Sequence, residues 1–259
     1  MARAIWKGVI RLDSVECPVK LYSAVRDRSI HFRLLAEDTL RPVKQRMVNP
    51  ATGEEVPYDR IRKGYEIEEG VFVLLDEDEL AELEPKKSRD IGVLRFVESG
   101  VITHAWYDRP YHLGPDGDDT AYFALADALR RTGREGVVRW TMRNKEYLGA
   151  LHVQEEHLML ITLRHAGEVI PASALDPPRG REPDERELEM AEQLVSALAA
   201  EFDPAEFDDE YRARVLDLVA AKAEGRTVTF RQPARRRAAG DLVASLEASL
   251  RAARERKSA

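Results

Sequence analysis

The chain has 259 residues, of which 44% are hydrophobic and 34% are charged, and its formal net charge at pH 7 is −7. This length and composition are typical of a soluble protein that buries one large core or two modest ones. It contains no run of about 18 apolar residues and begins with no signal-peptide pattern, so we expect no membrane partner and a cytoplasmic location. Cys17 is the only cysteine, which excludes an internal disulfide and a zinc site built from cysteines.

The first 175 residues are expected to form mainly β-strands. Alternating or continuous apolar runs predict strands at 5–12, 17–25, 71–75, 91–97, 101–107, 137–142, 147–153 and 157–163. Ser99 and Gly100 predict a hairpin turn between the fourth and fifth of these strands, and residues 154–156 predict another between the last two. Two helices are expected among the strands, a short one at 75–83 and a longer one at 118–133 that stops at Gly133.

The pattern changes at the proline-rich segment "DPPRGREPDE", residues 176–185. Two helical apolar stripes follow, the first closed by Asp203-Pro204 and the second ending near Gly225. These helices could pack on their own barrel or reach around a partner subunit, and the residues leave both arrangements open. The chain is thus expected to divide into a β-rich core at 1–175, a helical arm at 176–230 and a basic tail at 231–259.

Charge is distributed unevenly along the chain. The net charge is −4 over residues 1–175, −9 over 176–225 and +6 over 226–259, where "RQPARRRAAG" places four arginines within ten residues. Because salt screens charges beyond about 8–10 Å, a local cationic surface can attract an anion although the whole protein is acidic. Net charge therefore does not exclude nucleic acid as a partner.

Three features could carry chemistry, and each also has a structural explanation. His152 and His157 flank a predicted turn and could bind a metal, although strand-end histidines are usually surface residues. The acidic run 76–79 could bind Mg²⁺ in a nuclease, or it could favour a helix N-terminus electrostatically. Cys17 could be a nucleophile, but a small packed apolar residue is the favoured interpretation.

Clustered cations give a stronger indication. They occur at Arg26, Arg28, Arg33, Arg41, Lys44 and Arg46, and again in "RRTGREGVVRWTMRNK", residues 130–145. Arg139, Thr141 and Arg143 alternate, so we expect them to share one face of a strand. Such a face points to solvent or to a phosphate backbone, because unpaired charges cannot enter a core. No base-reading motif accompanies these clusters, which favours contact with phosphates over recognition of sequence.

Several phrases, taken in order, resemble the bacterial Ku proteins of non-homologous end joining. They are "RAIWKGVIRL", "CPVKLYSA", "EEVPYDRIRKGYE", "FVLLDEDELAEL", "ALRRTGREGVVRWTMRNKEYLGAL" and "DLVASLEASL". The resemblance runs from about Ala2 to Arg251. It implies an α+β, mainly β fold: a β-barrel core, then a C-terminal helical arm, then a short basic tail with an amphipathic helix.

The resemblance also implies a function. Such proteins form a homodimeric ring through which double-stranded DNA ends thread, without catalysis and without sequence recognition, and they recruit and stimulate an ATP-dependent ligase, DNA ligase D. The implied location is the cytoplasm, associated with the nucleoid. The candidates for lining the ring are Arg26, Arg28, Arg33, Arg41, Lys44, Arg46, Arg109, Arg139, Arg143 and Lys145. The candidates for ligase binding are Leu242, Leu246, Leu250 and Arg251 in the last helix, and the arginines of 231–237 could touch either DNA or acids of the ligase.

One departure from the resemblance concerns zinc. Many bacterial Ku proteins carry a zinc-binding pair of cysteines before the "EVPY" phrase, whereas this chain has "PVKQRMVNPATGEEVPY" there. "NPATG" instead predicts a turn at Asn49–Gly53. We therefore expect no zinc and no other cofactor.

Overall fold

The computed structural model describes residues 3–117, 119–177, 179–226 and 242–257. The chain divides into two units, Met1–Ala174 and Leu175–Ala259. Across the described residues, no helix is both long enough and apolar enough to cross a bilayer.

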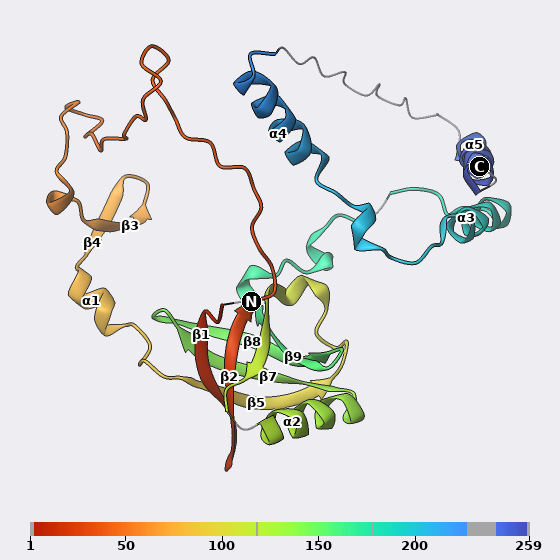
Figure 1. Ribbon diagram of the computed structural model, residues 1–259, viewed down its shortest axis with the longest axis horizontal. Coiled ribbons are helices and arrows are strands. Elements are labelled where there is room, and N and C mark those ends of the chain that lie inside the picture. The colour runs from red at the N-terminus through yellow and green to blue at the C-terminus, as the bar shows by residue number, and fades with distance from the viewer. Residues whose placement is uncertain (1–2, 118, 178, 227–241, 258–259) are drawn as a thin grey trace. The chain divides into compact units, whose positions relative to one another are not determined.

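Seven strands of the first unit form a closed barrel in the order β1-β2-β6-β9-β8-β7-β5 (Figure 1). Their bounds are β1 (Trp6–Leu12), β2 (Val15–Ser23), β5 (Asp90–Glu98), β6 (Tyr107–Pro115), β7 (Arg134–Met142), β8 (Lys145–Gln154) and β9 (His157–Leu163). Neighbouring strands are antiparallel except β1 and β5, which pair in parallel and close the barrel. The predicted fold class, mainly β with a barrel core and C-terminal helices, is confirmed.

Apolar side chains at alternating positions of the strands fill the interior of the barrel. Ile10 of β1 and Cys17, Val19 and Leu21 of β2 are at most 1% exposed. Burial raises the pKa of the Cys17 thiol to about 11, so the thiol stays protonated at neutral pH. Cys17 is therefore a packed core residue, as the favoured interpretation has it, because a protonated thiol is a poor nucleophile.

Helix α2 (Asp119–Thr132) covers one end of the barrel, where β6 ends and β7 begins (Figure 1). It packs against β2, β7 and β8. Tyr122 on its inner face is 2% exposed, and its hydroxyl donates to the Leu113 carbonyl at 2.7 Å and accepts from the Leu158 amide at 2.8 Å. These bonds attach the helix to strands β6 and β9.

The opposite end, called here the extension end, carries a long excursion of the chain. β2 ends there at Ser23 and β5 begins there at Asp90, so residues 24–89 leave the barrel and return to it at the same end. The starts of β1, β6 and β8 and the ends of β7 and β9 lie at this end too, because neighbouring strands alternate in direction. Cations carried by any of these segments are therefore brought to one end of the barrel.

The extension, residues 24–89, consists of short elements and loops that form no core of their own. It includes a 3-10 turn (Tyr58–Arg60), a two-stranded hairpin of β3 (Lys63–Glu68) and β4 (Val71–Leu75), and helix α1 (Glu77–Glu82). None of its residues is buried, and Phe32, Leu40 and Leu74 are 67%, 72% and 68% exposed. The turn predicted at 49–53 is confirmed: the Gly53 amide donates to the Asn49 carbonyl at 2.8 Å, and Gly53 has φ +74°.

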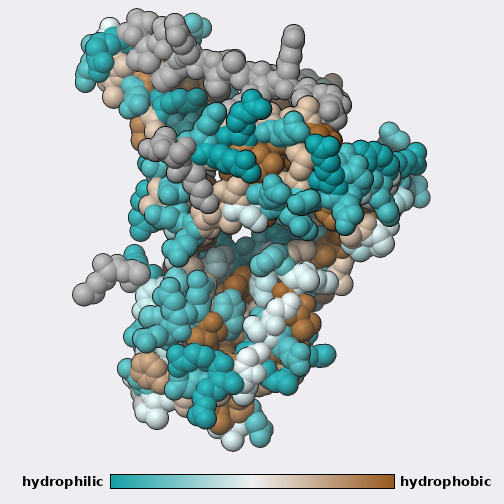
Figure 2. Space-filling view, turned by 90° about the vertical axis from the view of Figure 1, so that its right-hand side faces the viewer, coloured by the Kyte–Doolittle hydropathy of each residue, from teal (hydrophilic) through white to brown (hydrophobic). Residues whose placement is uncertain are grey.

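The second unit consists of helices α3 (Glu185–Leu198), α4 (Glu210–Ala223) and α5 (Leu242–Lys257). Asp184 caps α3 by accepting from the Glu187 amide, and Glu187 reaches back to the Asp184 amide. α5 packs along α3. Apolar side chains of the chain also remain at the surface, as the hydrophobic patches among hydrophilic residues show (Figure 2).

The strand predicted at 101–107 and its hairpin at Ser99-Gly100 are wrong. Residues His104–Trp106 form a 3-10 turn, and the strand is β6, which begins at Tyr107 and pairs with β2 and β9. Gly100 does have a positive φ, +87°, but its amide donates to the buried Glu135 carboxylate at 3.0 Å. The turn therefore leads β5 away from the following segment, and β5 pairs with β7 and β1 instead.

Candidate nucleic-acid interface

Seven cationic side chains from four separate segments surround the extension end of the barrel. We call this set the basic rim: Arg26, Arg28, Lys87, Arg89, Arg109, Arg143 and Lys145. Arg26 and Arg28 follow β2, Lys87 and Arg89 precede β5, and the others lie at the start of β6 and in the β7–β8 hairpin. All seven are exposed. The topology thus collects charges that are up to about 120 positions apart in the sequence.

Aromatic rings lie among these cations. Tyr111 is buried and burial raises its pKa, while Arg109 and Arg143 are near enough to act on it electrostatically in the opposite direction. The Lys145 ammonium lies 5.5 Å from the centre of the Tyr147 ring, a cation–π contact. The Tyr147 ring in turn stacks on Trp140 at 5.3 Å. The stacked rings of Tyr147 and Trp140 therefore pack against the part of the basic rim that contains Lys145.

Arg139 and Arg143 do not share a strand face, which corrects the sequence prediction. β7 ends at Met142, which pairs with Lys145, so Arg143 and Asn144 form a two-residue turn. Both have positive φ, +51° and +62°, as a type I′ turn requires. Arg139 lies within β7 on the outer surface of the barrel and is paired with Glu146, whereas Arg143 lies at the extension end.

The remaining predicted cations lie in the extension. They are Arg33, Arg41, Lys44 and Arg46, all exposed. Arg46 forms an ion pair with Glu55 at 2.8 Å, across the turn that contains Asn49 and Gly53. The extension begins at the basic rim, so these four cations come after Arg26 and Arg28 in the chain. Their contact with DNA remains a prediction.

Sequence reasoning missed Lys87 and Arg89. The run "PKKSRD" at 85–90 is basic, and it directly precedes a predicted strand. That position is a signal that the run lies at a strand end. Nothing in the local pattern places it next to the β7–β8 turn, because that neighbourhood depends on the pairing of β5 with β7.

The other candidate sites have structural explanations. Asp76 and Glu79 of the acidic run form a capping box at the start of α1, which uses both side chains for helix backbone amides. His152 is half-buried, and burial lowers its pKa, while His157 is exposed at the start of β9. Within the described ranges, no three His, Cys, Asp or Glu side chains are grouped to hold a metal. The nuclease alternative therefore receives no support.

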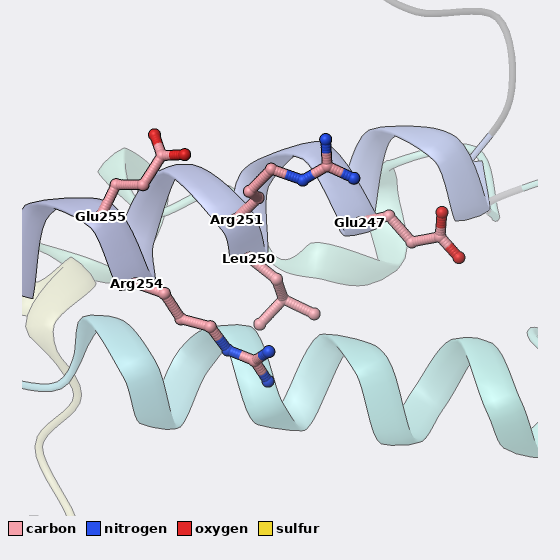
Figure 3. A pocket seen from close by; sticks show the side chains of 5 residues that line it. All are labelled: Glu247, Leu250, Arg251, Arg254 and Glu255. Carbon is pink, nitrogen blue, oxygen red and sulfur yellow. The ribbon is translucent and has the colours of Figure 1, made fainter.

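The last helix presents its predicted contact residues unequally. Leu250 is 8% exposed and extends toward α3 together with Arg254, whereas Arg251 and Glu255 extend away from α3 (Figure 3). Leu242 at the start of the helix is 50% exposed. Arg186 of α3 lies 3.7 Å from Glu247 of α5. The four residues predicted to bind a ligase thus lie on one helix, but one of them is covered by α3. The arginines of 231–237 lie outside the described residues.

Comparisons with known proteins match nearly the whole chain. Residues 11–190 match the family described as "Ku70/Ku80 beta-barrel domain". The "Non-homologous end joining protein Ku" of Anaeromyxobacter sp. (strain K) is 37% identical over 261 residues, which cover 99% of this chain and 88% of that protein. The "Non-homologous end joining protein Ku 2" of Geotalea uraniireducens is 36% identical, covering 95% and 97% of the two chains. That of Pseudomonas aeruginosa is 35% identical, covering 86% and 78%.

Proposed function

The chain belongs to the bacterial Ku family, and on this premise we propose that it binds the ends of double-stranded DNA in non-homologous end joining. The observation that carries the proposal is the basic rim. Seven exposed cations meet at one barrel end, and none of the described elements has the form of a base-reading motif. Cations that contact phosphates fix a protein on a duplex without reading its sequence.

We propose that the active form is a homodimer in which the extensions of two copies complete a ring around the duplex. The β3–β4 hairpin supports this, because a two-stranded sheet without a buried face is marginal in water. Its apolar side chains, among them Phe72 and Leu74, are 59% and 68% exposed in a single copy. A second copy would remove this surface from water, at about 25 cal/mol per Å² of apolar area covered.

The proposed ring has no catalytic role, and its proposed partner is the ATP-dependent DNA ligase D. The last helix supports this assignment, because Leu242, Leu246 and Arg251 lie on α5 with Leu242 half exposed. An amphipathic helix that offers an apolar stripe is a common way to dock into a groove of a partner. The DNA-bound protein would then be associated with the nucleoid.

The decisive experiment compares linear and covalently closed circular duplexes of the same sequence and length in gel shifts at matched salt. A ring that loads only from an end should bind the linear form and leave the closed circle unshifted. The affinity for linear DNA should fall with salt, with a slope of about −0.9 per neutralised phosphate. Equal retention of both forms would remove the ring mechanism while leaving DNA binding intact.

A further inference from the structure

A notch at the extension end combines three of the rim cations with neutral hydrogen-bonding groups. We call it the basic notch; its volume is about 320 Å³, and it is lined by Trp6, Lys87, Ser88, Arg89, Thr141, Arg143 and Asn144. These residues come from the start of β1, the segment before β5 and the β7–β8 hairpin.

The backbone of the notch is fixed by close packing. The Val9 amide donates to the Arg89 carbonyl at 2.8 Å, which ties the segment before β5 to β1. A Cβ on Gly8 would lie 2.6 Å from that carbonyl and 2.2 Å from the Trp6 ring, so only glycine allows the ring and Arg89 to approach this closely. The Asp90 amide donates to the Ser88 hydroxyl at 3.0 Å, which holds Ser88 beside them.

The hairpin supplies the other wall. Arg143 and Asn144 are the two central residues of the β7–β8 turn, with φ of +51° and +62°. Asparagine tolerates this region of backbone conformation, whereas arginine adopts it rarely. The turn therefore holds a long cationic side chain at a position where the turn geometry alone would favour a small residue.

The acids beside the notch are already paired with other cations. Asp90 accepts from Arg11 at 2.6 Å, and Glu146 lies 3.6 Å from Arg139. In the part of the chain that the structure describes, Lys87, Arg89 and Arg143 form no salt bridge. Three positive charges thus line one notch without a neighbouring carboxylate to neutralise them, an arrangement that an anion would stabilise.

We propose that the basic notch binds a phosphate group of the DNA backbone, and that Lys87 and Arg89 are DNA contacts in addition to those indicated by the sequence. This inference rests on the proposed function. Arginine and lysine with serine, threonine and asparagine are the side chains that commonly contact DNA phosphates. Internal and strand-terminal phosphates share this chemistry, so the experiment distinguishes between them.

The test is a double variant, Lys87→Ala with Arg89→Ala, titrated with a short linear duplex over a range of salt. Its matched control is Lys7→Ala with Lys20→Ala, which removes the same charge from the same barrel where Asp116 neutralises both lysines at 3.0 and 2.8 Å. We expect the first variant to lose about tenfold or more in affinity. The magnitude of its salt slope should fall by about 0.9 for each lost contact. The control should bind like the wild type.

Two duplexes, with and without 5′-phosphates, identify the phosphate. If the wild-type protein loses affinity when the 5′-phosphate is removed and the double variant does not, the notch binds the phosphate at the strand end. If the double variant binds both duplexes more weakly than the wild type by the same factor, the notch binds an internal phosphate. Wild-type affinity and slope in a double variant with a wild-type melting temperature would overturn the inference. Failure of the proposed function is a different result, in which the wild-type protein itself does not bind linear DNA.

Discussion

Arg139 and Glu146 lie diagonally across the β7–β8 hairpin, with 3.6 Å between Arg139 Nε and Glu146 Oε1. Both side chains are about half exposed, at 55% and 53%. An exposed pair of this kind contributes little to stability, about 0–1 kcal/mol, and is screened by salt. The main effect of the pair is therefore not on stability: Glu146 partly neutralises the charge of Arg139 and so weakens its attraction to a phosphate.

The first prediction follows from this pair. Glu146→Gln should strengthen binding of linear DNA roughly two- to fivefold, because Arg139 no longer has a competing carboxylate. The magnitude of the salt slope should rise by up to about 0.9. Glu156→Gln is the matched control, since Glu156 is an exposed acid in the β8–β9 turn at the other end of the barrel. Unchanged affinity in Glu146→Gln would show that Arg139 does not contact DNA.

Local patterns predicted the barrel strands that alternate or are continuously apolar. They failed at β6, whose sequence "YDRPYHLGP" contains two prolines and a glycine and is a strand only because β2 and β9 pair with it. They also failed at Arg143, because a turn made of Arg-Asn lacks the glycine that usually marks a type I′ hairpin. Tertiary pairing decided both cases.

The candidate interface likewise contains some cations that local sequence predicts and others that only strand pairing brings together. The clusters near Arg26 and Arg143 could be found from the sequence, because several cations occur close together. Lys87 and Arg89 could not be joined to them, because that requires β5 to lie between β1 and β7. Which cations meet at one end of the barrel is decided by the order of its strands, so a short stretch of sequence cannot predict it.

The second prediction concerns the attachment of α2. Tyr122→Phe removes a hydroxyl that bonds both the Leu113 carbonyl and the Leu158 amide in a buried position. We expect the free energy of unfolding to fall by about 2–3 kcal/mol, because buried backbone groups lose their partners. Urea titration followed by tryptophan fluorescence measures this, since Trp6, Trp106 and Trp140 all lie in the first unit. Tyr58→Phe, at a residue 89% exposed, should change little. A loss as small as the control's would show that the two hydrogen bonds do not hold α2.

The third prediction is a pH dependence at the start of α3. Hydrogen bonds from Arg181 lower the pKa of Glu187 from 4.5 to about 2, and the Asp184 amide adds to this effect. Because the folded-state pKa is lowered, the stabilisation is complete above about pH 4.5 and is lost as the pH falls toward 2. Hydrogen exchange of α3 amides should therefore increase in Glu187→Gln above pH 4.5 and match the wild type near pH 2.

The control for this pH dependence is Glu189→Gln, an exposed acid of the same helix whose side chain accepts from Gln193 at 3.5 Å. Exchange in this variant should follow the wild type at every pH. A difference between Glu187→Gln and the wild type that persists unchanged at pH 2 would mean that the ion pair is not its source.

The last prediction separates two roles within α5. Leu250→Asp should release α5 from α3, because about 1.5–3 kcal/mol of apolar burial is lost and a carboxylate is placed against the neighbouring helix. Leu242→Asp should leave that packing intact, because Leu242 is half exposed. Hydrogen exchange of residues 242–257 measures release, and a ligation assay with DNA ligase D measures recruitment. If the exposed part of the helix docks the ligase, Leu242→Asp lowers stimulation without raising exchange. Full stimulation in Leu242→Asp, combined with its loss in Leu250→Asp, would instead require α5 to leave α3 before the ligase binds.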